Sequence, residues 1–136
     1  MANVSFDILL KGIYFNTRLK VYYLKDKIKK MFIKKEIINY KNCLVHKISK
    51  SIFWDVKIEN LDYDRNKEYI IKRVYTRGNQ EDEIVLWKLY SYYTMRNIIP
   101  YLDDLDDITI SYLSIIFNLK KEKFKCYGKK LFYLRY

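Results

Sequence analysis

The first third of the chain shows two different patterns of apolar and polar positions. Residues 18–24, RLKVYYL, place Leu19, Val21 and Tyr23 on one side of an extended backbone, a period that is typical of a short strand. Directly afterwards, the apolar residues recur at helical spacing and lysines occupy much of the remaining surface. The pattern predicts a short strand or hairpin, followed by a basic amphipathic helix over residues 25–35.

The predicted basic helix carries six lysines close together. Its apolar side consists of Leu24, Ile28, Met31 and Phe32, and its lysines are Lys25, Lys27, Lys29, Lys30, Lys34 and Lys35. Positive charge is concentrated in this part, because residues 1–50 contain 12 Lys and Arg against 3 Asp and Glu in a chain of formal net charge +11. Such lysines can neutralise nucleic-acid phosphates, contact an acidic partner protein or an anionic membrane surface, or lie on a solvated face. The pattern alone leaves these alternatives open.

The second part of the chain begins with sharper helix signals. Asp62 or Asp64 can cap a helix N-terminus, and an apolar row follows at helical spacing. Lysine and arginine side chains crowd the far end, where positive charge complements the helix dipole. Gly78 then offers a residue for the left-handed conformation that commonly ends helices. We therefore expect a helix over residues 64–77 that ends at an Arg-Gly turn.

Two further helices are predicted directly after this turn. Asn79 is placed to cap a helix with an acidic first turn, and Trp87 falls on its apolar side, which favours a core position. Thr94 can start another helix, but Pro100 removes a backbone donor and clashes with the preceding turn. This third helix is expected to be short or bent near residues 97–100.

Four aspartates precede the most apolar segment of the chain. They are Asp103, Asp104, Asp106 and Asp107, and the segment ITISYLSIIFN follows at residues 108–118. A calcium loop would need a central glycine and a terminal acid that this stretch lacks, and a two-metal nuclease site would need further acids from elsewhere. A helix cap needs only Asp106 or Asp107 before the apolar run. We expect a capped helix here, with a strand as the alternative because of the β-branched residues, and Asp103 and Asp104 as candidate contacts for a protein partner.

The remaining reactive and aromatic residues offer little support for catalysis. His46 is the single histidine, which excludes a His-based triad or a multi-His metal site within one chain. Cys43 and Cys126 are far apart and outside any CxxC pair, so neither a disulfide framework nor a zinc site is indicated. Trp54 has apolar neighbours that favour a core position, with an anchor for a protein partner as the alternative. We expect no enzymatic activity and no cofactor.

These patterns together predict a mainly α protein. We expect a domain of four to five short helices over residues 51–127, a basic N-terminal extension over residues 1–50 and a weakly strand-like tail at residues 128–136. No segment approaches the run of about 20 apolar residues that a membrane span requires. The chain is therefore expected to lack a membrane span and to be cytoplasmic.

Over about residues 51–127 the chain resembles a family of small, uncharacterised prokaryotic helical domains. The shared features are an aromatic-Trp-Asp opening, an Arg-Gly turn after a helix, a second helix with an acidic start, and a terminal Phe-Leu and basic-Cys segment. They correspond here to Phe53, Trp54 and Asp55; to Arg77 and Gly78; to Glu81, Asp82 and Trp87; and to Phe117, Leu119, Phe124 and Cys126. The chain departs from the pattern at Asn118, where the family has glycine, and at Pro100.

The resemblance implies a role as a protein partner. Such domains are often encoded beside a nucleotidyltransferase-like toxin of the abortive-infection type, which implies a cognate antitoxin or regulator. We therefore expect a non-enzymatic interaction or regulatory protein, plausible as an antitoxin-like partner of such a toxin. The alternative is a nucleic-acid-binding protein that uses the Lys-rich segment 18–50.

Overall fold

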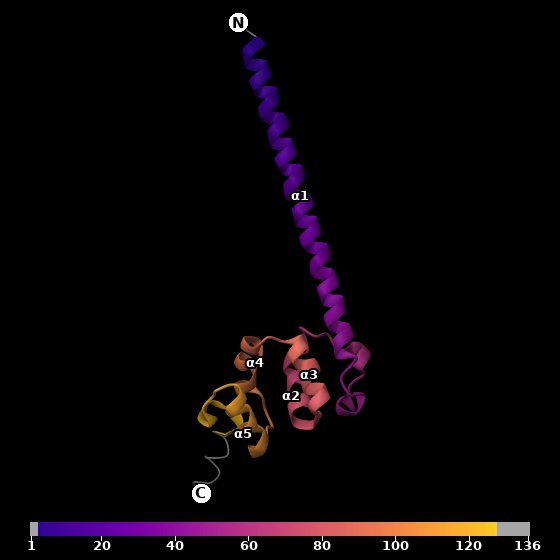
Figure 1. Ribbon diagram of the computed structural model, residues 1–136, viewed down its shortest axis with the longest axis vertical. Helices are drawn as coiled ribbons and strands as arrows, with labels where there is room; N and C mark the ends of the chain where they lie inside the picture. The colour runs from indigo at the N-terminus through magenta and orange to yellow at the C-terminus, as the bar shows by residue number, and fades with distance from the viewer. Residues whose placement is uncertain (1–2, 128–136) are drawn as a thin grey trace. The chain divides into compact units, whose positions relative to one another are not determined.

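The computed structural model describes the backbone of residues 3–127 and the side chains of residues 24–127 (Figure 1). All regular elements in the described part are helical, which confirms the mainly α fold class. The chain divides into two compact units, residues 1–39 and residues 40–136. The predicted tail at residues 128–136 lies outside the described residues.

One long helix, α1 (Asn3–Val45), runs through the first unit and ends in the second. The basic helix expected over residues 25–35 is part of it, but the short strand expected over residues 18–24 is wrong, because these residues are helical as well. The alternation that suggested a strand spans only a few residues between helical patterns. A lone strand would leave its backbone groups without partners, whereas an established helix adds one hydrogen bond for each further residue.

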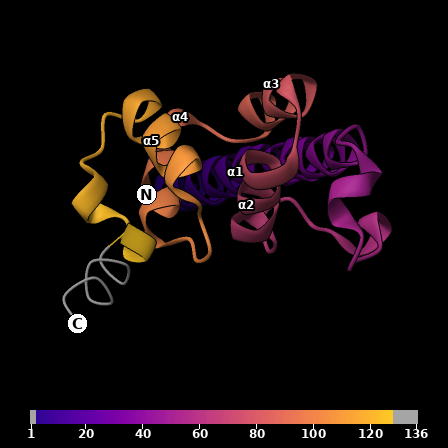
Figure 2. The same cartoon turned by 90° about the horizontal axis from the view of Figure 1, so that it is seen from below.

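The second unit contains eight short helical elements after the end of α1 among the described residues. They are η1 (Lys50–Phe53), η2 (Ile58–Asn60), α2 (Lys67–Arg77), α3 (Gln80–Leu89), α4 (Tyr92–Ile98), η3 (Ile99–Tyr101), α5 (Asp107–Ile116) and η4 (Lys121–Lys123), where η denotes a 3-10 helix. Helices α2 and α3 lie side by side (Figure 1; Figure 2). The α-helices occupy the segments where the apolar periodicity predicted them.

A single hydrophobic core holds the second unit together. Its largest fully buried side chains include Phe117, Phe124 and several Ile and Leu residues from α2, α3 and α5. Leu44 and Val45, at the end of α1, belong to the same buried cluster. Burial of aliphatic and aromatic side chains of this kind is the main favourable term in folding, at about 25 cal/mol for each Å² of apolar surface.

Helix caps follow the sequence at two of the predicted sites. The side chain of Asn79 accepts a hydrogen bond from the backbone N–H of Asp82 at the start of α3. The side chain of Asp106 accepts one from Thr109 at the start of α5, as expected. Helix α4 begins earlier than predicted, because Ser91 rather than Thr94 is its N-cap. Pro100 lies in the 3-10 turn η3 after α4, so this helix is short, as expected.

The turns that flank α2 differ from the sequence prediction. Asp62 accepts hydrogen bonds from the backbone of Asp64 and Arg65, in a turn that precedes the helix rather than at its N-cap. Gly78 has φ −78°, so it does not adopt the left-handed conformation that we expected. A Cβ built on Gly78 would lie 2.6 Å from the carbonyl oxygen of Val74, and this close approach explains the glycine.

The end of α5 contains the aromatic centre of the fold. The ring of Phe117 stacks on those of Trp87 and Tyr92, with centroids 5.6 and 5.4 Å away. Trp87 is 38% exposed, so it covers the core rather than filling it, contrary to expectation. Asn118 follows with φ 47°, the left-handed conformation that asparagine tolerates better than most residues.

Candidate functional site

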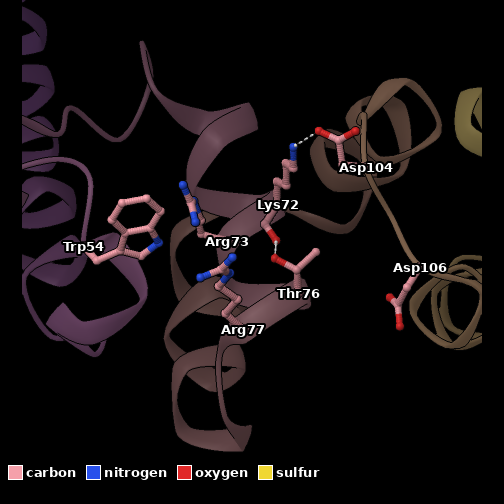
Figure 3. Close-up of a pocket in the computed structure, with 7 residues that line it drawn as sticks. All are labelled: Trp54, Lys72, Arg73, Thr76, Arg77, Asp104 and Asp106. Atoms are coloured by element: carbon pink, nitrogen blue, oxygen red, sulfur yellow. Dashed lines mark hydrogen bonds and ion pairs between the residues drawn. The ribbon is translucent and has the colours of Figure 1, made fainter.

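A pocket of about 410 Å³ opens beside α2 in the second unit (Figure 3). It is lined by Trp54, Lys72, Arg73, Thr76, Arg77, Asp104 and Asp106. The four α2 residues have the spacing i, i+1, i+4 and i+5, which places them on one face of the helix. The sequence therefore directs three cationic side chains and one hydroxyl into the same pocket.

The tryptophan side of the pocket is organised around Arg73. The guanidinium carbon lies 5.7 Å from the ring centroid of Trp54 and 5.1 Å from that of Tyr69, within the range of cation–π interactions. The same guanidinium binds the carboxylate of Asp55 at 2.5 Å. Trp54 is thus held against α2 while 69% of its surface remains exposed. The core position favoured by the sequence is wrong, since the preceding residue, Phe53, is buried in its place.

Asp55 is held by two side chains of α2. Tyr69 donates a hydrogen bond to one carboxylate oxygen, and Arg73 contacts the other. The hydrogen bond from Tyr69, together with the positive charge of Arg73, lowers the pKa of Asp55 below its usual value. Burial and the bond to Asp55 raise the pKa of Tyr69. These contacts fix the segment that carries Trp54, and they favour the ionised form of Asp55.

The opposite side of the pocket carries acidic groups. Lys72 lies 3.2 Å from the carboxylate of Asp104, and Thr76 donates a hydrogen bond to the carbonyl oxygen of Lys72. Asp104 itself has φ 59°. Figure 3 shows Lys72 and Asp104 pointing toward each other, with Arg73 and Arg77 on the side that faces Trp54. The pocket therefore has an aromatic, cationic side and an acidic side.

The DDLDD segment, residues 103–107, contains four of the ten aspartates of the chain. Among the residues whose side chains the structure describes, no group of three or more His, Cys, Asp or Glu is placed to hold a metal ion. Asp103 pairs with Lys125 at 3.1 Å and Asp104 with Lys72, while Asp106 caps α5. The capping interpretation of the segment is confirmed. Asp103 and Asp104 are exposed at the surface of the second unit.

The other candidate surface is the described part of α1. The six lysines, Lys25, Lys27, Lys29, Lys30, Lys34 and Lys35, are all exposed. Large apolar side chains between them are exposed as well, with fractions between 46% and 63%: Leu24, Ile28, Met31, Phe32, Ile33, Ile37 and Tyr40. We call residues 24–40 the α1 surface. Its cationic groups lie between Lys25 and Lys35, whereas its exposed apolar groups extend from Leu24 to Tyr40.

The remaining candidates have structural or surface positions. His46 and Cys43 are exposed near the end of α1. Cys126 is buried, where its thiol donates a hydrogen bond to the carbonyl oxygen of Leu102 at 3.1 Å. From the sequence, Arg73 and Arg77 were expected to complement the dipole at the end of their helix, and Arg77 also to belong to the Arg-Gly turn. The i, i+4 spacing of these two arginines was the signal that would have placed them on one face.

Residues 48–99 match the model of a family described as "Family of unknown function (DUF6922)". The matched region contains Trp54 and the four α2 residues of the pocket, and it begins after the end of α1. Neither the curated proteins nor the solved structures that were searched gave a match. The chain is therefore similar, over these residues, to a family whose function is unknown. Within the described residues, no helix is both long and apolar enough to cross a membrane.

Proposed function

We propose that the chain is a non-enzymatic interaction protein that binds a protein partner through the α1 surface. One observation carries the proposal: one face of α1 presents four large apolar side chains at helical spacing, each 48–63% exposed, namely Leu24, Ile28, Met31 and Phe32. Scattered apolar residues are common on protein surfaces, but a contiguous apolar surface generally marks a site of association. An exposed helix with apolar residues at helical spacing fits the mode in which a helix packs against a groove or another helix.

The pocket beside α2 supplies a second contact for the partner. Trp54 presents an aromatic ring of the type that dominates binding energy at protein interfaces, and Arg73 and Asp55 hold it in place. Asp104 lines the same pocket, and it and the preceding Asp103 are exposed and are proposed to contact basic groups of the same partner. This arrangement is compatible with binding and offers no nucleophile paired with a base among the seven lining residues.

The resemblance described under Sequence analysis suggests the identity of the partner. We propose a toxin of the nucleotidyltransferase type, encoded next to this chain in a prokaryotic genome, with this protein as its antitoxin-like regulator in the cytoplasm. The support for this finer proposal is the resemblance alone. The apolar α1 surface supports protein binding in general.

Coexpression with the product of the neighbouring gene tests the proposal. The full chain should copurify with that product, and the double substitution Ile28→Ser and Met31→Ser should abolish copurification. A matched control is Ile108→Ser with Ile115→Ser, because both residues are apolar and more than 75% exposed on α5. If wild type does not copurify and does not change the activity of the neighbouring protein, the antitoxin role is excluded. If both double variants behave like wild type, the α1 surface is not the docking element.

A second candidate function is nucleic-acid binding, which the exposure of all six α1 lysines favours. Release of counterions from phosphates would then make the affinity fall steeply with salt. Fluorescence anisotropy with a duplex and a single strand of about 20 nucleotides measures this dependence. Replacing Lys27, Lys29, Lys30 and Lys34 by Glu should abolish binding. Equal affinity of wild type and this variant would exclude the function.

A further inference from the structure

We propose that the partner presents an acidic amphipathic helix, which packs along the row formed by Leu24, Ile28, Met31, Lys35 and Ile38. This inference rests on the proposed function, because it specifies the chemistry of the partner of the α1 surface. The spacing of the row is four, three, four and three residues, the repeat that keeps side chains facing a neighbouring helix. All five residues lie in the first unit, and Leu24, Ile28 and Met31 are about half exposed or more.

Cations flank this row and also interrupt it. Lys27 and Lys34 are seven residues apart and border the row on one side, where heptad repeats place the charges that select a partner. Lys25 borders it on the other side. Lys35 lies within the row itself, at a core position where a lysine lowers the stability of a self-associated pair.

The acidic residues of the same segment lie away from the row. Asp26 and Glu36 are the only acids among residues 24–39, and helical geometry places both on outer positions. They therefore do not neutralise Lys27, Lys34 or Lys35 along the contact line. The row presents an apolar strip with uncompensated positive charge at its centre and edge.

A second copy of this chain is a poor occupant of the row. In a parallel pair, Lys35 would face Lys35 of the other copy, and in an antiparallel pair the flanking lysines would face one another. Like charges in close contact oppose association, whereas Glu or Asp residues on a partner helix would match each lysine. Nucleic acid would contact the lysines and leave Leu24, Ile28 and Met31 in water. The observations thus favour an acidic helix over both alternatives.

Two synthetic peptides of about 21 residues serve as probes. One has leucine at the core positions of a heptad repeat and glutamate at the flanking positions, and the other has lysine at the same flanking positions. The full chain should bind the acidic peptide at least about tenfold more tightly in fluorescence anisotropy. The double variant Ile28→Ser and Met31→Ser should lose this binding, whereas Ile108→Ser with Ile115→Ser, at exposed apolar positions of α5 outside the α1 surface, should keep it.

Charge variants test the role of the flanking lysines. Lys27→Glu with Lys34→Glu should weaken binding of the acidic peptide and strengthen that of the basic peptide. Lys29→Glu with Lys30→Glu changes the net charge equally at outer positions and should preserve the preference. If both variants shift the preference by the same factor, the effect is one of net charge alone, and the inference is overturned.

Sedimentation equilibrium tests the exclusion of a second copy. Lys35→Leu completes the apolar row. This variant should therefore self-associate through the row at concentrations where wild type does not. If wild type already dimerises and Ile28→Ser with Met31→Ser abolishes the dimer, a second copy is the occupant and the inference is wrong. Two other ligands are compared with the acidic peptide: DNA of about 20 nucleotides and vesicles with roughly 30 mol% phosphatidylserine. If the chain binds either of them more tightly than the peptide, the inference is also overturned.

The two proposals fail in distinguishable ways. If the neighbouring gene product copurifies through Ile28 and Met31 but the acidic peptide has no advantage, the interaction function stands and the acidic helix is excluded. If the acidic peptide binds along the row but the neighbouring product does not copurify, the inference stands and the toxin is excluded as partner.

Discussion

Asp82 of α3 accepts two hydrogen bonds from Ser49, one from its backbone N–H at 2.8 Å and one from its hydroxyl at 2.9 Å. The two residues are 33 positions apart, and Asp82 is only 3% exposed. The second oxygen of the same carboxylate accepts the backbone N–H of Asn79 at 3.1 Å. One buried side chain thus caps α3 and also fastens the segment that leaves α1 to the rest of the second unit.

Replacing Asp82 by Ala should destabilise the second unit by roughly 2–4 kcal/mol, because the backbone donors of Ser49 and Asn79 lose their partner. Ser49→Ala removes only the hydroxyl and should cost about 1 kcal/mol. Urea unfolding followed by circular dichroism measures both. Glu81→Ala, an exposed change in the same turn, is the control. If Asp82→Ala lowers the free energy of unfolding by no more than Glu81→Ala does, the hydrogen bonds of Asp82 do not stabilise the second unit.

Gly78→Ala should destabilise the unit by about 1–3 kcal/mol through crowding. The added Cβ would lie 2.6 Å from the carbonyl oxygen of Val74 and 3.2 Å from Cβ of Asp82, so the end of α2 has to move. Backbone strain is not the cause, since φ of Gly78 is −78°. Thermal unfolding of Gly78→Ala beside the exposed control Gln80→Ala tests this. A variant with unchanged melting temperature would show that the turn relaxes freely.

Asn118 should tolerate glycine but not alanine. Its φ of 47° lies in the left-handed region, which costs an alanine about 1–2 kcal/mol and costs a glycine almost nothing. We therefore expect Asn118→Ala to lower the free energy of unfolding by that amount and Asn118→Gly to preserve it. Lys120→Ala, at a residue with φ −70°, is the matched control. Equal stability of the alanine and glycine variants would refute the conformational explanation.

The contacts of Asp55 should make stability depend on pH in the acidic range. Because the hydrogen bond from Tyr69 and the charge of Arg73 lower the pKa of Asp55, the ionised form is favoured in the folded state. This contribution is fully present above the unfolded pKa of about 3.9 and is lost as the pH falls through the lower folded value. We expect the free energy of unfolding, measured with urea from neutral pH to the acid range, to fall less for Asp55→Asn than for wild type.

The control for this titration is Asp64→Asn, which removes an exposed carboxylate that pairs with Lys67. Parallel curves for Asp55→Asn and wild type would show that the contacts with Tyr69 and Arg73 do not stabilise the folded state.

Features that depend on a few neighbouring residues were predictable from the sequence. Asn79 and Asp106 cap α3 and α5 because each side chain reaches a backbone N–H three residues further along, a distance set by the helix itself. Such local reasoning did not detect the helical state of residues 18–24, because a short alternation of apolar residues cannot reveal that helix continues on both sides.

The sequence by itself determined where most helices form and how they are capped, since those features rest on contacts within about four residues. Tertiary structure decided which of the adjacent residues Phe53 and Trp54 is buried, because the choice depends on the surface of α2. It also joined Arg73 to Asp55 and Asp82 to Ser49. These pairs are separated by 18 and 33 residues, and only the burial of a common core brings such distant positions into contact.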